Sequence, residues 1–310
     1  MGGLIALDWG TSSLRAFRFD GAGTLGETRS RPWGIRHLPE GGFDAALAGI
    51  TAGWPTLPRL ACGMVGSRNG WREMAYLGLP ASAAQLGKAL GTVRAADGLD
   101  VHLLPGLRDP RGPDVMRGEE TQVFGALALR PALAAASTFI LPGTHSKWAV
   151  VRDGAVTGFR TMMTGELFAV LRQHSILGAT GVDAVDDADA FARGVIAARD
   201  SGAAGALSRL FSTRALMLDG ALAPASVPDY LSGLLIGEEF RAALADGLAR
   251  RDAPLQPIGE AALCERYRRA ASLFGIDLPT PIADAAAHGL WQLAAQAGLV
   301  SIHSEESRAC

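Results

Sequence analysis

Short apolar runs flank a Gly-Thr step twice in this chain, at residues 5–17 and 140–150. In both segments a Ser lies two residues after the Thr, and a second apolar run follows. This pattern predicts a strand, a tight turn and a second strand. A turn glycine lets the backbone approach a ligand closely, while hydroxyls and amides of the turn converge on one point. We therefore predict two hairpins that hold a polyphosphate from both sides, in a duplicated nucleotide-binding fold.

The remaining pattern alternates strands with helices. Apolar runs predict a strand, loop and strand over residues 17–28, a strand that runs into a Gly-rich loop over 59–67, strands at 101–106 and 155–161, and a strand with a glycine turn over 255–260. Apolar positions at helical spacing predict an entry loop and a helix over 115–129 and helices at 43–53, 165–177, 228–250, 261–274 and 282–296. Residues 21–26 spell G-x-G-x-x-G, but a return strand follows, so we assign them to a hairpin turn. The acidic residues 183–189 are expected to form a solvated loop. Pro131 and the alanines after it predict a boundary between two lobes, residues 1–130 and 131–310.

Composition agrees with an enzyme of two lobes. The 310 residues exceed the usual size of one compact unit, and 48% hydrophobic residues supply two cores. A net charge of -2 predicts no nucleic acid and no anionic membrane as partner. Three distant cysteines, Cys62, Cys264 and Cys310, predict a reducing compartment and no structural zinc. No basic leader and no apolar stretch of about 20 residues occurs, so a cytoplasmic location is expected.

The two hairpins carry the candidate chemistry. Asp8 lies on the first hairpin only, and a Mg²⁺ ion bound to phosphates prefers few carboxylates and several waters, so Asp8 is the candidate metal ligand. Lys147 is one of only two lysines in a chain rich in arginine, which favours a role for its compact charge. The candidate phosphate contacts are Gly10, Thr11, Ser12 and Ser13 on the first hairpin and Gly143, Thr144, Ser146 and Lys147 on the second.

Several blocks of this sequence resemble the 2-dehydro-3-deoxygalactonokinase family, within the superfamily of sugar kinases, Hsp70 and actin. The blocks occur in the same order along the chain, which makes the resemblance specific. They are Leu7-Asp8-Trp9-Gly10, Ala61-Cys62-Gly63-Met64-Val65-Gly66-Ser67, Val115-Met116-Arg117-Gly118-Glu119-Glu120-Thr121-Gln122, Leu141-Pro142-Gly143-Thr144-His145-Ser146-Lys147-Trp148, Met163-Thr164-Gly165-Glu166-Leu167 and Leu231-Ser232-Gly233-Leu234-Leu235-Ile236-Gly237.

The resemblance implies an α/β fold of two ribonuclease H-like lobes around an interlobe cleft. The first lobe would hold the sugar-acid site and the second the adenosine site, with the last helix at the hinge. The implied reaction is phosphorylation of the 6-hydroxyl of 2-dehydro-3-deoxy-D-galactonate by ATP and Mg²⁺, in galactonate breakdown. Glu119 is the implied general base, because Gly118-Glu119 stands where related carbohydrate kinases have Gly-Asp, and Glu120 is the alternative. Gly259 would lie at the adenosine-side turn.

A keto acid carries a carboxylate, so its pocket should offer amides, hydroxyls or an arginine. The candidate substrate contacts are Gly66, Ser67, Arg68, Arg117, Glu120 and Glu166, and Arg15 is a further candidate. A phosphohydrolase of the same fold and a kinase for another sugar acid are the alternative functions. The sequence leaves open the epimer, the choice between Glu119 and Glu120, the group that binds the substrate carboxylate, and the oligomeric state, a homodimer included.

Overall fold

The computed structural model describes residues 2–178, 181–249 and 253–301, and their contacts form two compact units. Within these ranges, unit 1 comprises the residues up to 136, residues 151–159 and the residues from 284 onward. Unit 2 comprises residues 137–150 and 160–283. This division differs from the lobes expected from the sequence, because the last helix and residues 151–159 belong with the first hairpin. Cys310 lies outside the described residues.

Unit 1 is built around a six-stranded sheet of order β3-β2-β1-β4-β8-β7. The first three strands are antiparallel neighbours, whereas β4 lies parallel to β1 and β8 lies parallel to β4. The strands are β1 (Leu4–Trp9), β2 (Leu14–Phe19), β3 (Leu25–Arg31), β4 (Arg59–Cys62), β7 (Gly91–Arg94) and β8 (Asp100–Leu103). The predicted first hairpin is therefore confirmed, and residues 20–24, which overlap the predicted turn at 21–26, connect β2 to β3 as a hairpin.

The core of unit 1 lies against this sheet. Trp9 is fully buried and packs edge-on against the rings of Phe43 and Trp71. Its indole nitrogen donates to the Trp33 carbonyl at 2.8 Å, which satisfies its one polar group. The shorter elements of this unit are α1 (Gly42–Ile50), α2 (Ala83–Lys88), β5 (Leu77–Gly78), β6 (Ala81–Ser82), β9 (Leu107–Asp109) and β10 (Asp114–Met116), with β10-β9-β5 forming a small sheet.

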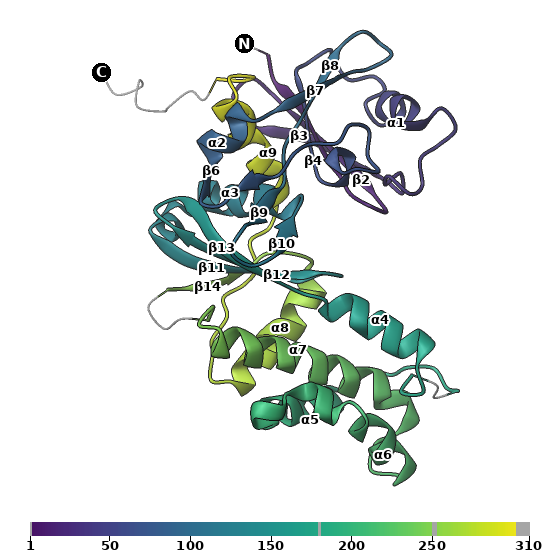
Figure 1. The fold of residues 1–310 in the computed structure, drawn as a ribbon. Coiled ribbons are helices and arrows are strands. Elements are labelled where there is room, and N and C mark those ends of the chain that lie inside the picture. The colour runs from purple at the N-terminus through teal and green to yellow at the C-terminus, as the bar shows by residue number, and fades with distance from the viewer. Residues whose placement is uncertain (1, 179–180, 250–252, 302–310) are drawn as a thin grey trace. The chain divides into compact units, whose positions relative to one another are not determined.

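Helices α3 (Glu119–Leu129) and α9 (Ala285–Gln296) lie side by side in unit 1 (Figure 1). Two glycines permit this close approach. A Cβ on Gly125 would lie 1.8 Å from the Ala285 carbonyl oxygen, and one on Gly289 would lie 1.8 Å from the Thr121 carbonyl oxygen. Because no side chain fits there, the backbones of the two helices are in direct contact. This packing ties the C-terminal helix to the helix that begins at the candidate base.

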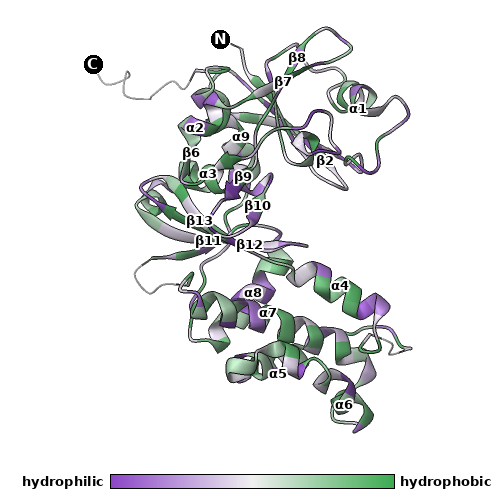
Figure 2. Cartoon of the chain, in the orientation of Figure 1, coloured by the Kyte–Doolittle hydropathy of each residue, from purple (hydrophilic) through white to green (hydrophobic). Residues whose placement is uncertain are grey.

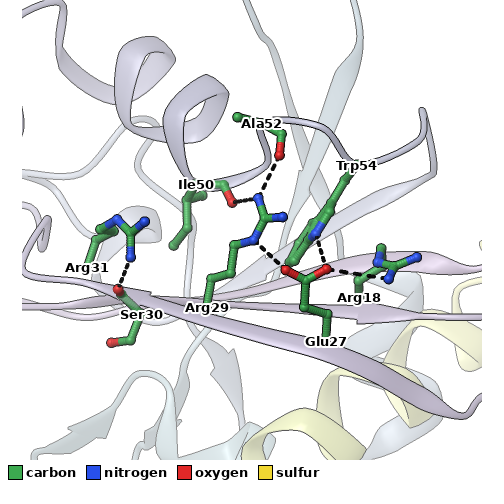
Figure 3. A network of polar contacts seen from close by, with 8 residues as sticks. All are labelled: Arg18, Glu27, Arg29, Ser30, Arg31, Ile50, Ala52 and Trp54. Carbon is green, nitrogen blue, oxygen red and sulfur yellow. Dashed lines mark hydrogen bonds and ion pairs between the residues drawn. The ribbon is translucent and has the colours of Figure 1, made fainter.

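A polar network fastens the edge strand β3 to the end of α1 (Figure 3). Arg29 donates to the Ile50 and Ala52 carbonyls at 3.0 and 2.7 Å, which supplies donors to carbonyls left unpaired where a helix ends. The Glu27 carboxylate accepts from Arg29 at 2.7 Å and from the Trp54 indole at 2.8 Å. These contacts to Arg29 and Trp54 lower the pKa of Glu27. The network thus orders the outer strand of the sheet that carries the first hairpin.

Unit 2 contains the second hairpin. Strands β11 (Ala136–Leu141) and β12 (Ser146–Arg152) are neighbours in its sheet, and β14 (Leu255–Pro257) lies parallel to β11. The predicted second hairpin and the strand at 255–260 are confirmed by these elements. Strand β13 (Ala155–Met162) follows β12, and its first residues pair with β6 of unit 1, the unit to which those residues belong.

The helices of unit 2 are α4 (Thr164–His174), α5 (Ala188–Arg199), α6 (Ser212–Leu218), α7 (Val227–Ala245) and α8 (Ala261–Leu273). Helix α7 packs along α5, and part of α8 is hydrophilic (Figure 2). The prediction of a loop over 183–189 is wrong at its end, because Asp187 caps α5 by accepting from the Ala190 amide. The last helix begins at Ala285 rather than 282, since Ile282 forms a bridge to Ile258. No described helix is long and apolar enough to cross a membrane.

Candidate active site

The turn of the first hairpin is short and braced from outside. The Gly10 amide donates to the Ser13 carbonyl at 2.9 Å, which closes the turn. The amides of Ile35 and Arg36 donate to the carbonyls of Gly10 and Thr11 at 3.0 and 3.2 Å. The side chains of Ser12 and Ser13 are exposed, and Thr11 is half-buried. The structure therefore leaves the hydroxyls of this turn accessible to a ligand.

Asp8 lies at the carboxyl end of β1, beside the end of the parallel strand β4. Its side chain is 17% exposed, and it forms an ion pair with Arg15 of β2. The Cys62 sulfur is 3.9 Å from Asp8 Oδ1. Burial lowers the pKa of Arg15, but the charge and hydrogen bond of Asp8 outweigh it, so the pKa is raised overall. Burial and the nearby Asp8 charge raise the pKa of the Cys62 thiol, which keeps Cys62 a neutral neighbour of the carboxylate.

Two glycines bring the start of α3 to the end of β4. Gly63 has a φ of 89° and Gly118 a φ of 109°, a region that residues with a side chain rarely adopt. A Cβ on Gly118 would lie 3.3 Å from the Gly63 Cα, and one on Gly63 would lie 3.6 Å from Asp8 Oδ1. These close contacts place Asp8, Gly63 and the first residues of α3 in one contiguous region of unit 1.

The two neighbouring glutamates at the start of α3 have different surroundings. Glu120 is fully buried, and its carboxylate oxygens accept from the Gly118 amide at 2.9 and 2.8 Å. Burial and the charge of Glu119 raise the pKa of Glu120 to about 8. Glu119 is only half-buried, and its carboxylate accepts from the Arg117 amide at 2.9 Å. Glu120 is therefore mostly protonated near neutral pH, whereas Glu119 has contact with solvent.

The other expected substrate contacts of unit 1 divide by exposure. Arg68 is exposed, whereas Gly66 and Ser67 are buried. Arg117 is half-buried, and its Nη2 donates to the Met74 carbonyl at 2.8 Å. A Cβ on Gly66 would lie 3.0 Å from Arg117 Nη1, so Gly66 leaves the room that the guanidinium occupies. The structure thus brings Gly66 and Arg117 together and leaves Arg68 on the surface.

In unit 2 the turn of the second hairpin lies against the start of α4. The Glu166 amide donates to the Thr144 carbonyl at 3.0 Å, and a Cβ on Gly165 would lie 2.5 Å from the Gly143 carbonyl oxygen. Thr144 is exposed. Glu166 forms a hydrogen-bonded pair with His145, and both side chains are nearly half exposed. This pairing places Glu166 beside the expected phosphate turn.

The sequence predicts that Ser146 and Lys147 contact phosphate, but both side chains are buried in the structure. Ser146 is fully buried, and its hydroxyl donates to Glu239 at 2.6 Å. Lys147 is 4% exposed, with its ammonium 3.4 Å from the His145 carbonyl oxygen. Both side chains therefore point into the packed part of unit 2, since alternate residues of a strand face opposite sides and β12 is buried on both.

Glu239 of α7 accepts four hydrogen bonds inside unit 2. It is 2% exposed and accepts from the Ser146 hydroxyl, the Trp148 indole at 2.7 Å, the Thr164 hydroxyl and the Tyr267 hydroxyl at 2.7 Å. Burial raises the pKa of Glu239, while these four donors oppose the shift. Burial and the Glu239 charge raise the pKa of Tyr267. One side chain of α7 thereby joins β12, α4 and α8.

A cavity of about 720 Å³ opens beside this cluster within unit 2. Gly143 and Thr144 of the hairpin turn line one part of it, with Thr164 and Gly165 of α4. Apolar and polar residues of α7 and α8 line another part, among them Ser232, Leu235, Ile236, Leu263, Arg266 and Tyr267. Gly259 has a φ of 149° and precedes α8 but is not a lining residue of this cavity. The volume of this cavity suits a small ligand such as a nucleoside.

Comparison with known proteins decides the family. The sequence profile of the 2-keto-3-deoxy-galactonokinase family matches residues 8–293. The chain belongs to this family. A 2-dehydro-3-deoxygalactonokinase of Escherichia coli K12 is 37% identical over 286 residues, which cover 91% of this chain and 94% of the relative. A protein of Rhizobium meliloti 1021, named a probable 2-dehydro-3-deoxygalactonokinase, is 40% identical over 312 residues, with 93% and 97% covered.

A solved structure supports the same assignment. A Sinorhizobium meliloti protein assigned as a 2-dehydro-3-deoxygalactonokinase superposes with a TM-score of 0.85 and 38% identity, covering 94% of this kinase and 98% of that chain. The α/β fold is that of the sugar kinase, Hsp70 and actin superfamily. The protein is a carbohydrate kinase.

Sequence reasoning missed two features of the site of this kinase. Glu239 lies 93 residues from Ser146, so no local pattern connects the two. The pairing of Arg15 with Asp8 was open to prediction, because a hairpin with its turn at residues 10–13 places these two residues opposite each other.

Proposed function

We propose that this kinase transfers the γ-phosphoryl group of ATP to the 6-hydroxyl of 2-dehydro-3-deoxy-D-galactonate. The observation that carries the proposal is the match to named kinases along more than nine-tenths of the chain, which includes both hairpins and the Gly118-Glu119 segment. Both curated relatives are named as kinases, so a phosphohydrolase is the less favoured alternative. A cytoplasmic location is proposed on the basis of the cysteine content.

We assign the general base to Glu119 rather than Glu120. Glu119 is the more accessible carboxylate, while Glu120 is buried, mostly protonated near pH 7 and bonded to the Gly118 amide. In the proposed step, the 6-hydroxyl oxygen forms a bond to the γ-phosphorus as the bond from that phosphorus to the β-bridging oxygen breaks. The proton of the hydroxyl passes to the Glu119 carboxylate, and ADP leaves with the electron pair of the broken bond. Glu120 would hold the Gly118 peptide and so position Glu119.

The residues of unit 1 fit a magnesium ion bound mainly to phosphates. Among the described residues no cluster of three or more His, Cys, Asp or Glu side chains forms a metal cage. Mg²⁺ keeps several waters and binds nucleotide phosphates through few protein carboxylates, so the partly exposed carboxylate of Asp8 suits it. When bound there, the ion would neutralise charge on the phosphates. Asp8 would hold it, directly or through water.

We assign the phosphate contacts to the turns of the two hairpins and the adenosine contacts to the cavity of unit 2. We propose that the Gly10 to Ser13 turn and the Gly143-Thr144 turn bind the phosphates through amides and hydroxyls, and that the cavity of unit 2 takes the nucleoside. The buried side chains of Ser146 and Lys147 would stabilise the hairpin and would not contact phosphate. Positioning of this kind supplies most of the catalysis in phosphoryl transfer.

The test is a kinase assay with a defined panel of acceptors. Purified protein, ATP and Mg²⁺ are incubated with 2-dehydro-3-deoxygalactonate, its 2-dehydro-3-deoxygluconate epimer or galactose, and ADP formation is followed with the phosphate position read by phosphorus NMR. We expect rapid formation of the 6-phosphate from the galactonate derivative only. The Glu119→Gln protein, purified in the same way, controls for contaminating kinases. ADP release that does not depend on any sugar acid would contradict the proposal.

A further inference from the structure

The Arg117 side chain is held in a defined orientation inside unit 1. It follows β10 and precedes α3, and its Nη2 donates to the Met74 carbonyl at 2.8 Å. The carbon at the centre of its guanidinium lies over the Tyr76 ring, 4.3 Å from the centroid, in a cation–π contact. Gly66 leaves room on another side, because a Cβ there would lie 3.0 Å from Nη1. The guanidinium is therefore fixed before any ligand binds.

Two of its nitrogens are nevertheless unsatisfied. Nε and Nη1 of Arg117 are buried and have no hydrogen-bond partner among the described residues. The hydroxyl of Ser67, the residue after Gly66, is also buried and unpartnered within the described part of the chain, and Ser67 is 9% exposed. Each buried polar group without a partner destabilises the protein, more so when it is charged. Three unsatisfied groups on two residues that adjoin Gly66 are the pattern of a site built for a ligand.

We propose that Arg117, assisted by Ser67, binds the carboxylate of the sugar-acid substrate. This inference rests on the proposed function, because it assigns the part of the acceptor site that distinguishes an acid from a neutral sugar. Nη1 lies beside Gly66, the chain neighbour of Ser67, so Nη1 would donate to one carboxylate oxygen and the Ser67 hydroxyl to the other, while Nε offers a further donor on another edge of the guanidinium. Arg117 lies two residues before Glu119, and its backbone amide donates to the Glu119 carboxylate at 2.9 Å, so the proposed receptor and the proposed base belong to the same region of unit 1.

The other two arginine candidates are less suitable. Arg15 already forms an ion pair with Asp8. Arg68 is exposed, where water competes for its donors and a carboxylate contact is worth little. A buried receptor also explains selectivity, since a neutral sugar would leave the same donors unpaired. Sites that hydrogen-bond one substrate group reject analogues without it by roughly 10⁴-fold.

The experiment compares two acceptors that differ at one group. One is 2-dehydro-3-deoxygalactonate, and the other is the matching 3-deoxy-ketohexose, in which a hydroxymethyl group replaces the carboxylate. The proteins are the wild type, Arg117→Met, Arg117→Lys, Ser67→Ala and a matched control, Arg108→Met. Arg108 is an exposed arginine of β9, paired in register with Val115 of β10. Melting temperatures confirm that each variant folds. If Arg117→Met does not fold, the comparison of the two acceptors is made with Arg117→Lys instead.

We expect Arg117→Met to lower kcat/KM for the sugar acid by about 10²- to 10³-fold, as for loss of one partner of a buried charge pair. Arg117→Lys keeps the charge without the planar guanidinium and its several donors, so its loss should fall between, and Ser67→Ala should lose roughly tenfold or less. The slow reaction of the neutral ketose should change less than about threefold, and Arg108→Met should match the wild type. Equal losses with both acceptors, or no loss with the acid, would overturn the inference.

The failure of the inference is distinct from that of the proposed function. If the wild type phosphorylates the sugar acid and Arg117→Met does so with an unchanged KM, only the carboxylate receptor is wrong. If the wild type phosphorylates no sugar acid, the proposed function fails. Calorimetric titration with the sugar acid then decides the inference by itself: binding by the wild type that Arg117→Met abolishes supports it, and equal or absent binding refutes it.

Discussion

Asp8 and Arg15 face each other in register across β1 and β2, and their side chains form an ion pair. The carboxylate proposed to hold magnesium is thus already paired with a cation of the protein. Arg15 is 46% exposed, so the pair is partly solvated and exchangeable. A metal ion and the guanidinium would compete for the same carboxylate, which makes Arg15 a modulator of the metal requirement.

The first prediction is that Arg15→Met lowers the Mg²⁺ concentration needed for the half-maximal rate by about two- to fivefold. This change corresponds to the free energy of one solvated ion pair. Asp8→Asn should raise that concentration and lower the rate. Magnesium titrations of initial rate measure both effects. Arg31→Met is the control, because Arg31 is an exposed arginine whose guanidinium donates to the Ser30 carbonyl (Figure 3). A higher requirement in Arg15→Met would mean that Arg15 contacts phosphate instead.

The second prediction separates the two glutamates at the start of α3. Glu119→Gln should lower kcat by about 10²- to 10⁴-fold, since general-base catalysis contributes that much, while ATP binding stays nearly intact. Glu120→Gln should lower kcat less than about tenfold, because the amide oxygen still accepts from the Gly118 amide. Steady-state kinetics with both substrates varied provide the measurement. The reverse order of the two effects would transfer the base to Glu120.

The local pattern of the sequence predicted most of the elements that position the site. Both hairpins, the turn at residues 21–26 and the strand before Gly63 follow from short-range signals, since turns and alternation are local properties. The same signals could not assign α9 to unit 1. That assignment depends on the contact of Gly125 with Gly289, two glycines 164 residues apart whose pairing no local pattern records.

The site residues show a similar limit. Glu119 and Glu120 are equivalent in a one-dimensional pattern, but neighbours on a helix point in directions about 100° apart, and only the packing of α3 decides which is buried. Ser146 was expected at the phosphates because of its place in the repeat. Its hydroxyl instead donates to Glu239. Both groups are buried away from water, so each needs the other as its hydrogen-bond partner.

The third prediction concerns stability and pH. The pKa of Glu120 is about 8 in the folded state against an ordinary 4.5, so between these values the native state holds a proton that the unfolded chain has released. This contribution to the free energy of unfolding is fully present below about pH 4.5 and is lost as the pH rises through 8, with a slope of at most about 1.4 kcal/mol per pH unit.

Urea unfolding of the wild type and Glu120→Gln at pH 5 to 9 measures the effect as a difference. The wild type should lose stability relative to Glu120→Gln as the pH rises, because the variant has no proton to lose. Carboxylates with lowered pKa values, such as Asp97, titrate below this window and are common to both proteins. Parallel stability curves for the two proteins would show that Glu120 is ionised in the folded state at all these pH values.

The fourth prediction concerns the Glu239 cluster. Each carboxylate oxygen accepts two donors. Glu239→Gln therefore replaces four charge-assisted hydrogen bonds with weaker neutral ones, and the two hydroxyls beside the new amide nitrogen must turn to accept from it. We expect the free energy of unfolding to fall by about 2 to 6 kcal/mol. Glu238→Gln is the matched control, because this neighbouring glutamate is partly exposed and pairs with Arg241, and its loss should cost less than about 1 kcal/mol. Equal losses would argue against a special role for the buried carboxylate.

The fifth prediction tests the cavity of unit 2 as the nucleoside site. Ser232 of α7 lines this cavity, and an indole in its place would fill space that the proposed nucleoside needs. Ser232→Trp should therefore raise the KM for ATP by at least about tenfold, or roughly 1.4 kcal/mol of lost binding, while the KM for the sugar acid changes little. Leu244→Trp on the same helix is the control, because Leu244 is 40% exposed and does not line the cavity. Binding of a fluorescent ADP analogue measures the effect independently of turnover. An unchanged affinity in Ser232→Trp, in a protein that melts like the control, would place the nucleoside outside this cavity.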